Sequence, residues 1–175
     1  MNFLTDYQRY AGTSEVPPVY HRWCALSVLA AAAQDRVWYT KFRGERTTPS
    51  LYVFLIGPSG IGKNVAIGPA TRLLSQSGIK LIRGKVTAQH LIDVLAQKGA
   101  AKQTVKDARL YLVTPELSLS IGRGPLADET VKLLTELYSG ADYPFYEGTR
   151  THGSVLFTGH NINWVGGTTK QWLRD

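Results

Sequence analysis

The sequence predicts a three-layer α/β fold with a mostly parallel central sheet and a helical segment at its N-terminus. Short apolar runs of strand length alternate with longer helical patterns along the chain, which is typical of this fold class. One such run, residues 51–56, ends in a glycine-rich turn, and a helical pattern over residues 65–75 follows it. The 175 residues are 43% hydrophobic and 19% charged, which indicates a single globular domain with a sizeable core.

The chain divides into two segments. Residues 1–36 are expected to form an N-terminal helical segment that packs on the core, and residues 37–175 the core itself. The expected helices cover residues 3–34 with a break at Pro17-Pro18, then 65–75, 87–97, 128–138 and 170–173. The expected strands cover residues 37–40, 51–56, 79–82, 110–113 and 162–165, and residues 145–151 and 154–158 are expected to pair as a hairpin.

Residues 57–64 fit the P-loop pattern at every position but the last, where Asn64 replaces serine or threonine. Glycines let backbone N–H groups approach an anion closely, and the N-terminus of the following helix adds partial positive charge. Lys63 supplies a mobile charge for the outer phosphates. The pattern predicts a nucleotide-phosphate site in a P-loop NTPase core, the alternative being an ordinary glycine-rich turn. The residues expected to bind the nucleotide, ATP, are Gly57, Pro58, Ser59, Gly60, Ile61, Gly62, Lys63, Asn64 and Val65.

Two residues are expected to hold Mg²⁺. The amide oxygen of Asn64 is a hard ligand that can reach the metal or a bridging water, although Asn64 can equally serve only as a helix cap. Glu116 follows the strand at residues 110–113, where a P-loop ATPase needs a carboxylate. It can act as general base or hold magnesium through water, the alternative being an exposed glutamate in a turn.

Thr168 and Thr169 follow the last expected strand. A hydroxyl there can orient the attacking water or sense the terminal phosphate, and a helix N-cap is the alternative role. Ligands bind at the carboxyl ends of parallel strands, so Gly57, Glu116 and Thr168 are expected on one edge of the sheet. Lys63, Glu116 and Thr168 are therefore the expected catalytic residues.

The basic balance of the chain favours anionic partners. The net charge is +7 and the pI is near 9.6, which is compatible with nucleotides and nucleic acid. Arg123 and Arg150 are candidates for an arginine that neutralises transition-state charge, the alternative being surface charges. The basic residues that could contact a phosphate backbone, or simply lie in solvated loops, are Lys41, Arg43, Arg46 and Lys102.

Other features narrow the function classes. The apolar run at residues 25–33 is too short to span a membrane, and the N-terminus lacks the pattern of a signal peptide. Cys24 is the single cysteine, so no internal disulfide forms and a cytoplasmic location is expected. The histidines show no metal-ligand spacing, and the tryptophans are expected to pack in the core rather than stack on bases.

Six segments in this order carry a family resemblance: Tyr20-His21-Arg22-Trp23 with its alanine-rich helix, Pro49-Ser50-Leu51-Tyr52-Val53, residues 57–64, Pro115-Glu116-Leu117-Ser118, Leu134-Thr135-Glu136-Leu137-Tyr138-Ser139-Gly140, and Gly166-Gly167-Thr168-Thr169 before Trp172-Leu173. Together they resemble the ATPase domain of phage- and prophage-type primase–helicase proteins, a P-loop group related to AAA+ and superfamily 3 helicases. The resemblance implies ATP hydrolysis coupled to DNA work in a homo-oligomeric ring, for example a hexamer. It implies that Lys63 binds phosphate, that Glu116 is the acidic residue of the second motif, and that Thr168 or Thr169 is the sensor.

The chain departs from that family in two places. Thr114 and Pro115 stand before Glu116, so the usual adjacent aspartate is missing, and the chain stops soon after the sensor-like turn, before a fifth strand and a lid. We therefore expect a fragment or a shortened relative. Two other functions compete with a helicase ATPase: a small P-loop kinase, which the lack of an arginine-rich lid disfavours, and a non-catalytic nucleotide-binding module.

Overall fold

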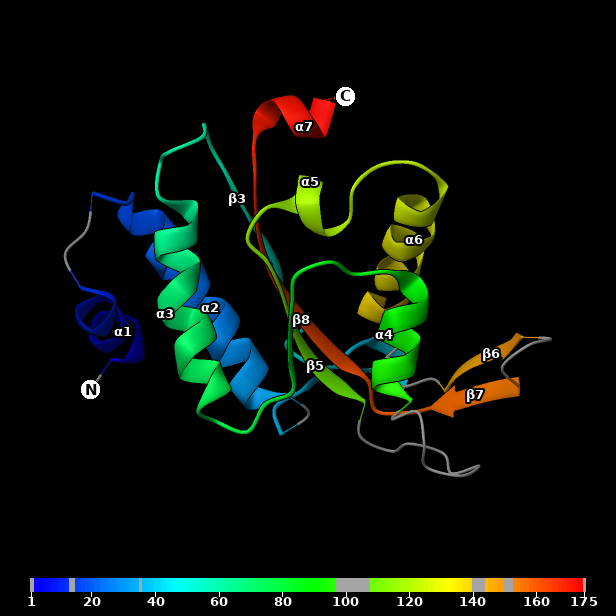
Figure 1. Cartoon of the computed structure of the whole chain (residues 1–175). Coiled ribbons are helices and arrows are strands. Elements are labelled where there is room, and N and C mark those ends of the chain that lie inside the picture. The colour runs from blue at the N-terminus through cyan, green and yellow to red at the C-terminus, as the bar shows by residue number, and fades with distance from the viewer. Residues whose placement is uncertain are drawn as a thin grey trace.

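The computed structural model describes residues 2–12, 15–34, 36–96, 108–139, 144–149 and 153–174. Its centre is a four-stranded parallel sheet with the strand order β3-β8-β5-β4 (Figure 1). The strands are β3 (Tyr52–Ile56), β4 (Leu81–Arg83), β5 (Arg109–Thr114) and β8 (Asn161–Thr168). The predicted α/β class with a parallel central sheet is confirmed.

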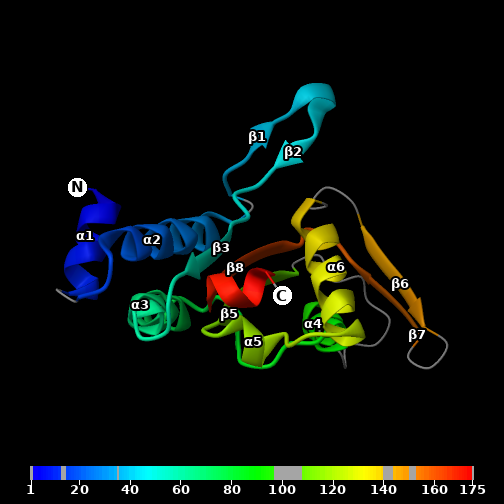
Figure 2. The same cartoon turned by 90° about the horizontal axis from the view of Figure 1, so that it is seen from above.

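Helices cover both faces of this sheet (Figures 1 and 2). One face carries α1 (Phe3–Ala11), α2 (Pro18–Ala33) and α3 (Lys63–Ser75). The other carries α4 (Ala88–Leu95), α5 (Leu117–Ser120) and α6 (Pro125–Ser139). The short helix α7 (Lys170–Arg174) follows β8.

The alternation of side chains along β5 shows why the sheet needs two helical layers. Leu110 and Leu112 lie in the core shared with α4 and α6, whereas Tyr111 and Val113 lie in the core shared with α2 and α3. All four residues are at most 2% exposed. A strand buried on both faces is apolar at every position, which is the pattern that the sequence shows here.

Two antiparallel hairpins flank the sheet. β1 (Tyr39–Thr40) and β2 (Arg46–Thr47) are joined by a 3₁₀ turn at Phe42–Gly44, and Figure 2 shows this pair projecting away from the body of the molecule. β6 (Phe145–Thr149) pairs with β7 (Gly153–Phe157), so the expected hairpin in this region is confirmed.

The last strand of the sheet is longer than the sequence predicts, because β8 continues through Gly166 and Gly167 to Thr168. A Cβ atom on Gly166 would lie 2.7 Å from Thr114 Oγ1, and one on Gly167 would lie 2.4 Å from the carbonyl oxygen of Pro115. These two glycines therefore let β8 pass close to β5 instead of starting a turn.

Several other expectations need correction or lie outside the described residues. β8 begins at Asn161, one residue before the strand expected at 162–165, and Asn161 and Asn163 are buried in it, where their amides bond to neighbouring polar groups. Trp23 and Trp38, expected in the core, are 46% and 48% exposed. The linker at residues 99–107, with Lys102, and the residues Arg150 and His152 lie outside the described ranges.

Among the described residues, none of the helices combines the length and the apolar character that a membrane crossing requires.

Candidate functional site

The carboxyl edge of the sheet brings together three residues that are far apart in the sequence. Because β8 lies between β3 and β5, the residues that follow these strands are neighbours in space. Gly57, directly after β3, donates its N–H to the carbonyl oxygen of Thr168 at 3.1 Å. Glu116 follows β5 by two residues. The sequence-based expectation that these three residues share one edge therefore agrees with the topology.

A hollow of about 220 Å³ opens at this edge, between the glycine-rich loop and the end of β5. The residues that line it are Ser59, Gly60, Gly62, Lys63, Asn64 and Glu116. Five other predicted site residues lie beside the hollow rather than in its wall: Gly57, Pro58, Ile61, Val65 and Thr168. The structure thus brings together the predicted lysine and both predicted metal ligands.

The shape of the loop depends on glycines and on the N-terminal helices. Gly60 and Gly62 have φ angles of 84° and 83°, which side chains other than glycine rarely adopt. A Cβ on Gly57 would lie 2.5 Å from Tyr20 Oη, and one on Gly62 would lie 2.5 Å from Val16 Cγ2. The loop is therefore pressed against the segment that leads into α2.

Tyr20 is a site-supporting residue that the sequence analysis did not single out for this role. Its hydroxyl donates a hydrogen bond of 2.8 Å to the carbonyl oxygen of Ile56, the last residue of β3. This bond fixes the point at which the strand ends and the loop begins. No local sequence signal indicates it, because the two residues are 36 positions apart.

Lys63 is the first residue of α3, and its side chain folds back over the loop. It is only 7% exposed, and Nζ donates hydrogen bonds of 2.8 Å to the carbonyl oxygens of Gly57 and Pro58. Because this ammonium group is bonded only to neutral carbonyls, no bonded negative group compensates its charge. Its field therefore acts on the adjacent hollow.

Glu116 lines the same hollow and forms no ion pair with Lys63. The carboxylate is half-buried, and its Oε1 accepts a hydrogen bond of 3.2 Å from Ser118 Oγ. Thr114, at the end of β5, is fully buried, and its Oγ1 accepts a bond of 2.7 Å from Trp164 Nε1. Thr114 is therefore committed to packing, and among the described residues Glu116 is the only carboxylate that lines this hollow.

The two threonines after Gly167 have different roles. Thr169 Oγ1 accepts a bond of 3.3 Å from the N–H of Trp172, so Thr169 is the N-cap of α7. Thr168 is fully buried, and its Oγ1 has no hydrogen-bond partner within the described part of the chain. An unsatisfied buried hydroxyl costs about 1–3 kcal/mol. The fold thus uses the hydroxyl of Thr169 as a helix cap, whereas the hydroxyl of Thr168 has no hydrogen bond among the described residues.

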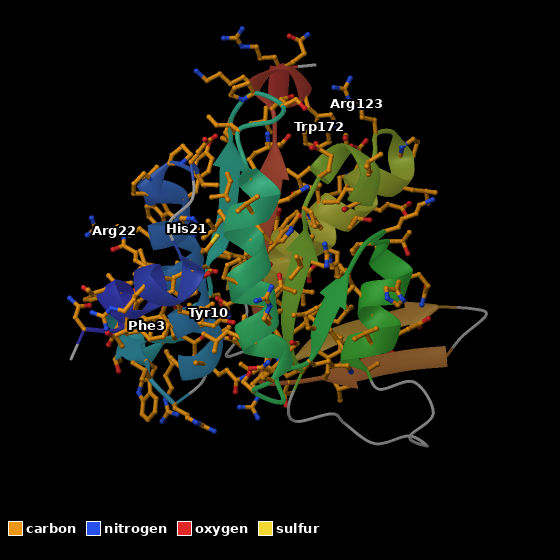
Figure 3. The ribbon with its side chains drawn as sticks, turned by 60° about the vertical axis from the view of Figure 1, so that its left-hand side comes forward. Phe3, Tyr10, His21, Arg22, Arg123 and Trp172 are labelled. Carbon is orange, nitrogen blue, oxygen red and sulfur yellow. The ribbon has the colours of Figure 1, made fainter. Side chains whose placement is uncertain are left out.

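Arg123 is held at helix α7 (Figure 3). Its Nη2 donates a hydrogen bond of 3.2 Å to the carbonyl oxygen of Trp172, and its guanidinium carbon lies 5.9 Å from the centre of that ring. Arg123 does not line the hollow formed by Lys63 and Glu116. It therefore contributes no charge at the wall of that hollow.

A larger hollow, of about 460 Å³, lies at the opposite end of the sheet. Two of the three basic side chains in its wall have partners within the fold: Arg109 donates to Gln34 Oε1, and Lys80 donates to the carbonyl oxygen of Val94. Among the described residues, its wall contains no carboxylate and no glycine-rich loop at the start of a helix. The smaller hollow is the better candidate because its wall combines such a loop with a lysine and a carboxylate.

No metal centre made only of protein side chains is evident, because the described residues contain no group of three or more histidine, cysteine, aspartate or glutamate side chains that could hold an ion. A cation at the carboxyl edge would depend on Glu116, on Asn64 and on oxygen atoms of a ligand. This is the usual situation of Mg²⁺, which is bound through one or two carboxylates together with phosphate oxygens.

Comparison of the chain with protein-family models, with curated proteins and with solved structures finds no match.

Proposed function

We propose that this chain is an ATP-binding and ATP-hydrolysing domain of a DNA helicase or replication protein of the phage or mobile-element type. The observation that carries the proposal is the hollow whose wall joins the glycine-rich loop, Lys63, Asn64 and Glu116. Its wall contains both anion-binding groups and a carboxylate, and phosphoryl transfer requires both kinds of group.

The residues present fit a nucleoside triphosphate with Mg²⁺. The first N–H groups of α3, which begins at Lys63, have no partners within the helix and lie next to the hollow. Mg²⁺, when bound, would neutralise charge on the outer phosphates, with Glu116 and Asn64 as its protein-side ligands or as ligands of its waters. The unsatisfied hydroxyl of Thr168 supports a role in holding a water or a phosphate oxygen.

The size of the hollow supports binding of the phosphate chain rather than of the whole nucleotide. Sites that enclose a whole small molecule usually measure about 300–1,000 Å³, whereas this hollow measures about 220 Å³. The base and ribose would then lie outside it, where a neighbouring subunit can cover them. In the proposed ring, the active site would be completed between two copies.

The function is tested by the rate of ATP hydrolysis with and without single-stranded DNA, for the 175-residue chain and for Lys63→Ala. Removing one preorganised donor from a site of this kind lowers turnover by roughly 100- to 1,000-fold, and we expect a loss of that size. Lys80→Ala is the matched control, because Lys80 lies at the other hollow. A rate that neither DNA nor Lys63→Ala changes would refute the proposal.

A second measurement tests the assembly. If a neighbouring copy completes the site, turnover per protein molecule rises steeply with protein concentration. Turnover that is independent of concentration would argue for a site complete within one chain.

A non-catalytic nucleotide-binding module is the second candidate. It is favoured by one observation: the position at the end of β5 is Thr114, whose hydroxyl is bonded to Trp164 and not directed to the hollow. A module of this kind binds ATP tightly and releases no phosphate, even with DNA and at high protein concentration. Steady turnover would exclude it.

A further inference from the structure

The hairpin formed by β1 and β2 carries aromatic side chains that the fold does not cover. Phe42, at its tip, is 89% exposed, and Tyr39 and Trp38 are 60% and 48% exposed. Figure 2 shows the hairpin projecting away from the sheet and its helices. Aromatic side chains gathered on a projecting element leave apolar surface in water, which marks a surface for a partner.

Basic residues alternate with these rings. The eleven residues from Arg36 to Arg46 contain four basic residues and one acidic residue, a net charge of +3 out of the +7 of the whole chain. The guanidinium carbon of Arg46 lies 4.9 Å from the centre of the Trp38 ring, which orients the ring and places a positive charge beside it. The combination of stacking surface and positive charge fits a polyanion that has exposed bases.

The hairpin has a defined shape and a fixed base. Its turn is closed by a bond of 2.7 Å from the N–H of Lys41 to the carbonyl oxygen of Glu45, and Gly44 provides the positive φ angle of 84°. Below the hairpin, Asn161 Nδ2 donates to Thr48 Oγ1 at 3.0 Å, and Asn163 Oδ1 accepts the N–H of Leu51 at 2.9 Å.

The two asparagines are buried and bonded to each other at 2.8 Å. They anchor the base of the hairpin to the amino end of β8, so its aromatic side chains are held in place before any partner binds.

We propose that the β1–β2 hairpin is a binding element for single-stranded nucleic acid, with Trp38, Tyr39 and Phe42 as stacking surfaces for bases and Lys41 and Arg46 as contacts to phosphates. Aromatic stacking needs base faces that are not already stacked in a duplex, which is why a single strand fits and a duplex does not. The inference rests on the proposed function for the choice of DNA as the partner.

The test measures the affinity of the 175-residue chain for a fluorescein-labelled oligothymidylate of roughly 16 nucleotides, the upper end of typical site sizes, by fluorescence anisotropy without nucleotide. We expect Trp38→Ala to weaken binding by roughly fivefold or more, which is the low end of the loss for one stacked base. Trp23→Ala is the matched control, since Trp23 is 46% exposed but lies on α2. It should bind like the unmodified chain.

The charge contribution is measured separately. Lys41→Gln should make the slope of log affinity against log salt shallower by about 0.7, the value for one phosphate contact on a single strand. The corresponding duplex should bind more weakly and should not respond to Trp38→Ala. Circular dichroism of each variant confirms that the fold is kept.

The inference would be overturned if Trp38→Ala left the affinity for the oligonucleotide unchanged. If Trp38→Ala also abolished self-association in sedimentation velocity, the hairpin would be a contact between protein chains and not a DNA-binding element. Lys63→Ala should bind the oligonucleotide normally in this nucleotide-free assay. If the proposed ATPase function is wrong, ATP turnover will be absent while DNA binding is intact. If the hairpin inference is wrong, ATP turnover will be present while DNA binding through the hairpin is absent.

Discussion

The carboxyl edge of the sheet gathers residues from three distant parts of the chain, whereas the β1–β2 hairpin takes its whole surface from eleven consecutive residues. At the edge, Lys63 is buried and Glu116 half-buried, and a Cβ atom on Gly62 or Gly167 would clash with its neighbours. On the hairpin, the aromatic side chains are 48% to 89% exposed. Substitutions at the edge should thus change both stability and chemistry, while substitutions on the hairpin should change binding alone.

The strand β8 belongs to both regions. Its amino end holds the base of the hairpin through Asn161 and Asn163, and its carboxyl end places Thr168 beside the glycine-rich loop. The two regions therefore lie at opposite ends of one buried strand, and variants at each end can be compared within the same fold.

After Lys63→Ala, the largest effect is expected for Glu116→Gln. The amide keeps an oxygen that can accept the Ser118 hydrogen bond but removes the charge and the basicity. General-base catalysis contributes about 100- to 10,000-fold, so we expect ATP turnover to fall by roughly 100-fold while ATP binding remains. Turnover is measured by phosphate release and binding by calorimetry. Unchanged turnover would show that Glu116 has no part in the reaction.

Gly167→Ala should destabilise the fold at the carboxyl edge. The new methyl group would meet the Pro115 carbonyl oxygen at 2.4 Å, and the Lys63 Cβ at 3.5 Å limits its retreat. Overpacking of this kind costs about 1–3 kcal/mol, measured by urea unfolding. Leu119→Ala is the control, because Leu119 is 78% exposed on α5. It should change the free energy of unfolding by no more than about 0.5 kcal/mol.

A smaller effect is expected from pH. Burial lowers the pKa of His160 below its usual 6.5, and both ring nitrogens lack hydrogen-bond partners among the described residues. Below pH 6.5 the unfolded chain binds a proton that the folded chain resists, so the free energy of unfolding falls as the pH decreases from 6.5 through the lowered pKa. The slope from one histidine is at most about 1.4 kcal/mol per pH unit.

His160→Leu should flatten this slope in unfolding curves recorded between about pH 7.5 and about pH 5, a range that includes the usual pKa of histidine. His90→Gln is the control, because His90 is exposed on α4. An identical pH dependence for His160→Leu and the unmodified chain would exclude His160 as its source.

The smallest effect on stability is expected on the hairpin. Trp38→Ala should change the free energy of unfolding by no more than about 0.5 kcal/mol, the usual range for surface substitutions, although it weakens oligonucleotide binding. A much larger loss in urea unfolding would mean that the ring supports the fold, and the contrast between the two regions would fail.

Some parts of the fold can be predicted from the sequence, and others cannot. The strand before Gly57, the helix beginning near residue 87 and the pairing of β6 with β7 follow from local patterns and are confirmed. The burial of Asn161 and Asn163 does not follow from such a pattern, because asparagine favours turns locally but is stabilised here in a buried strand by bonds to Thr48 and Leu51. These partners lie more than 100 positions away and leave no local signal.

The candidate site shows the same division. Local spacing identified the glycine-rich loop, Lys63 and Glu116, whose roles in ATP hydrolysis remain predictions. Spacing gives little reason to prefer Thr168, the expected catalytic residue, over Thr169, since both follow the last strand. The structure adds a difference between them: Thr169 accepts a hydrogen bond from Trp172, whereas the Thr168 hydroxyl has no partner in the described part of the chain.

The sequence by itself determined the alternation of strands and helices, the position of the glycine-rich loop and the basic charge of the chain, because each depends on residues within a few positions of one another. Only the tertiary structure decided that β8 lies between β3 and β5, that Tyr20 fixes the end of β3, and that Trp38 is exposed on a projecting hairpin. Strand order and burial depend on contacts between distant segments. A local sequence pattern does not indicate which distant segment will pack against the element that it predicts.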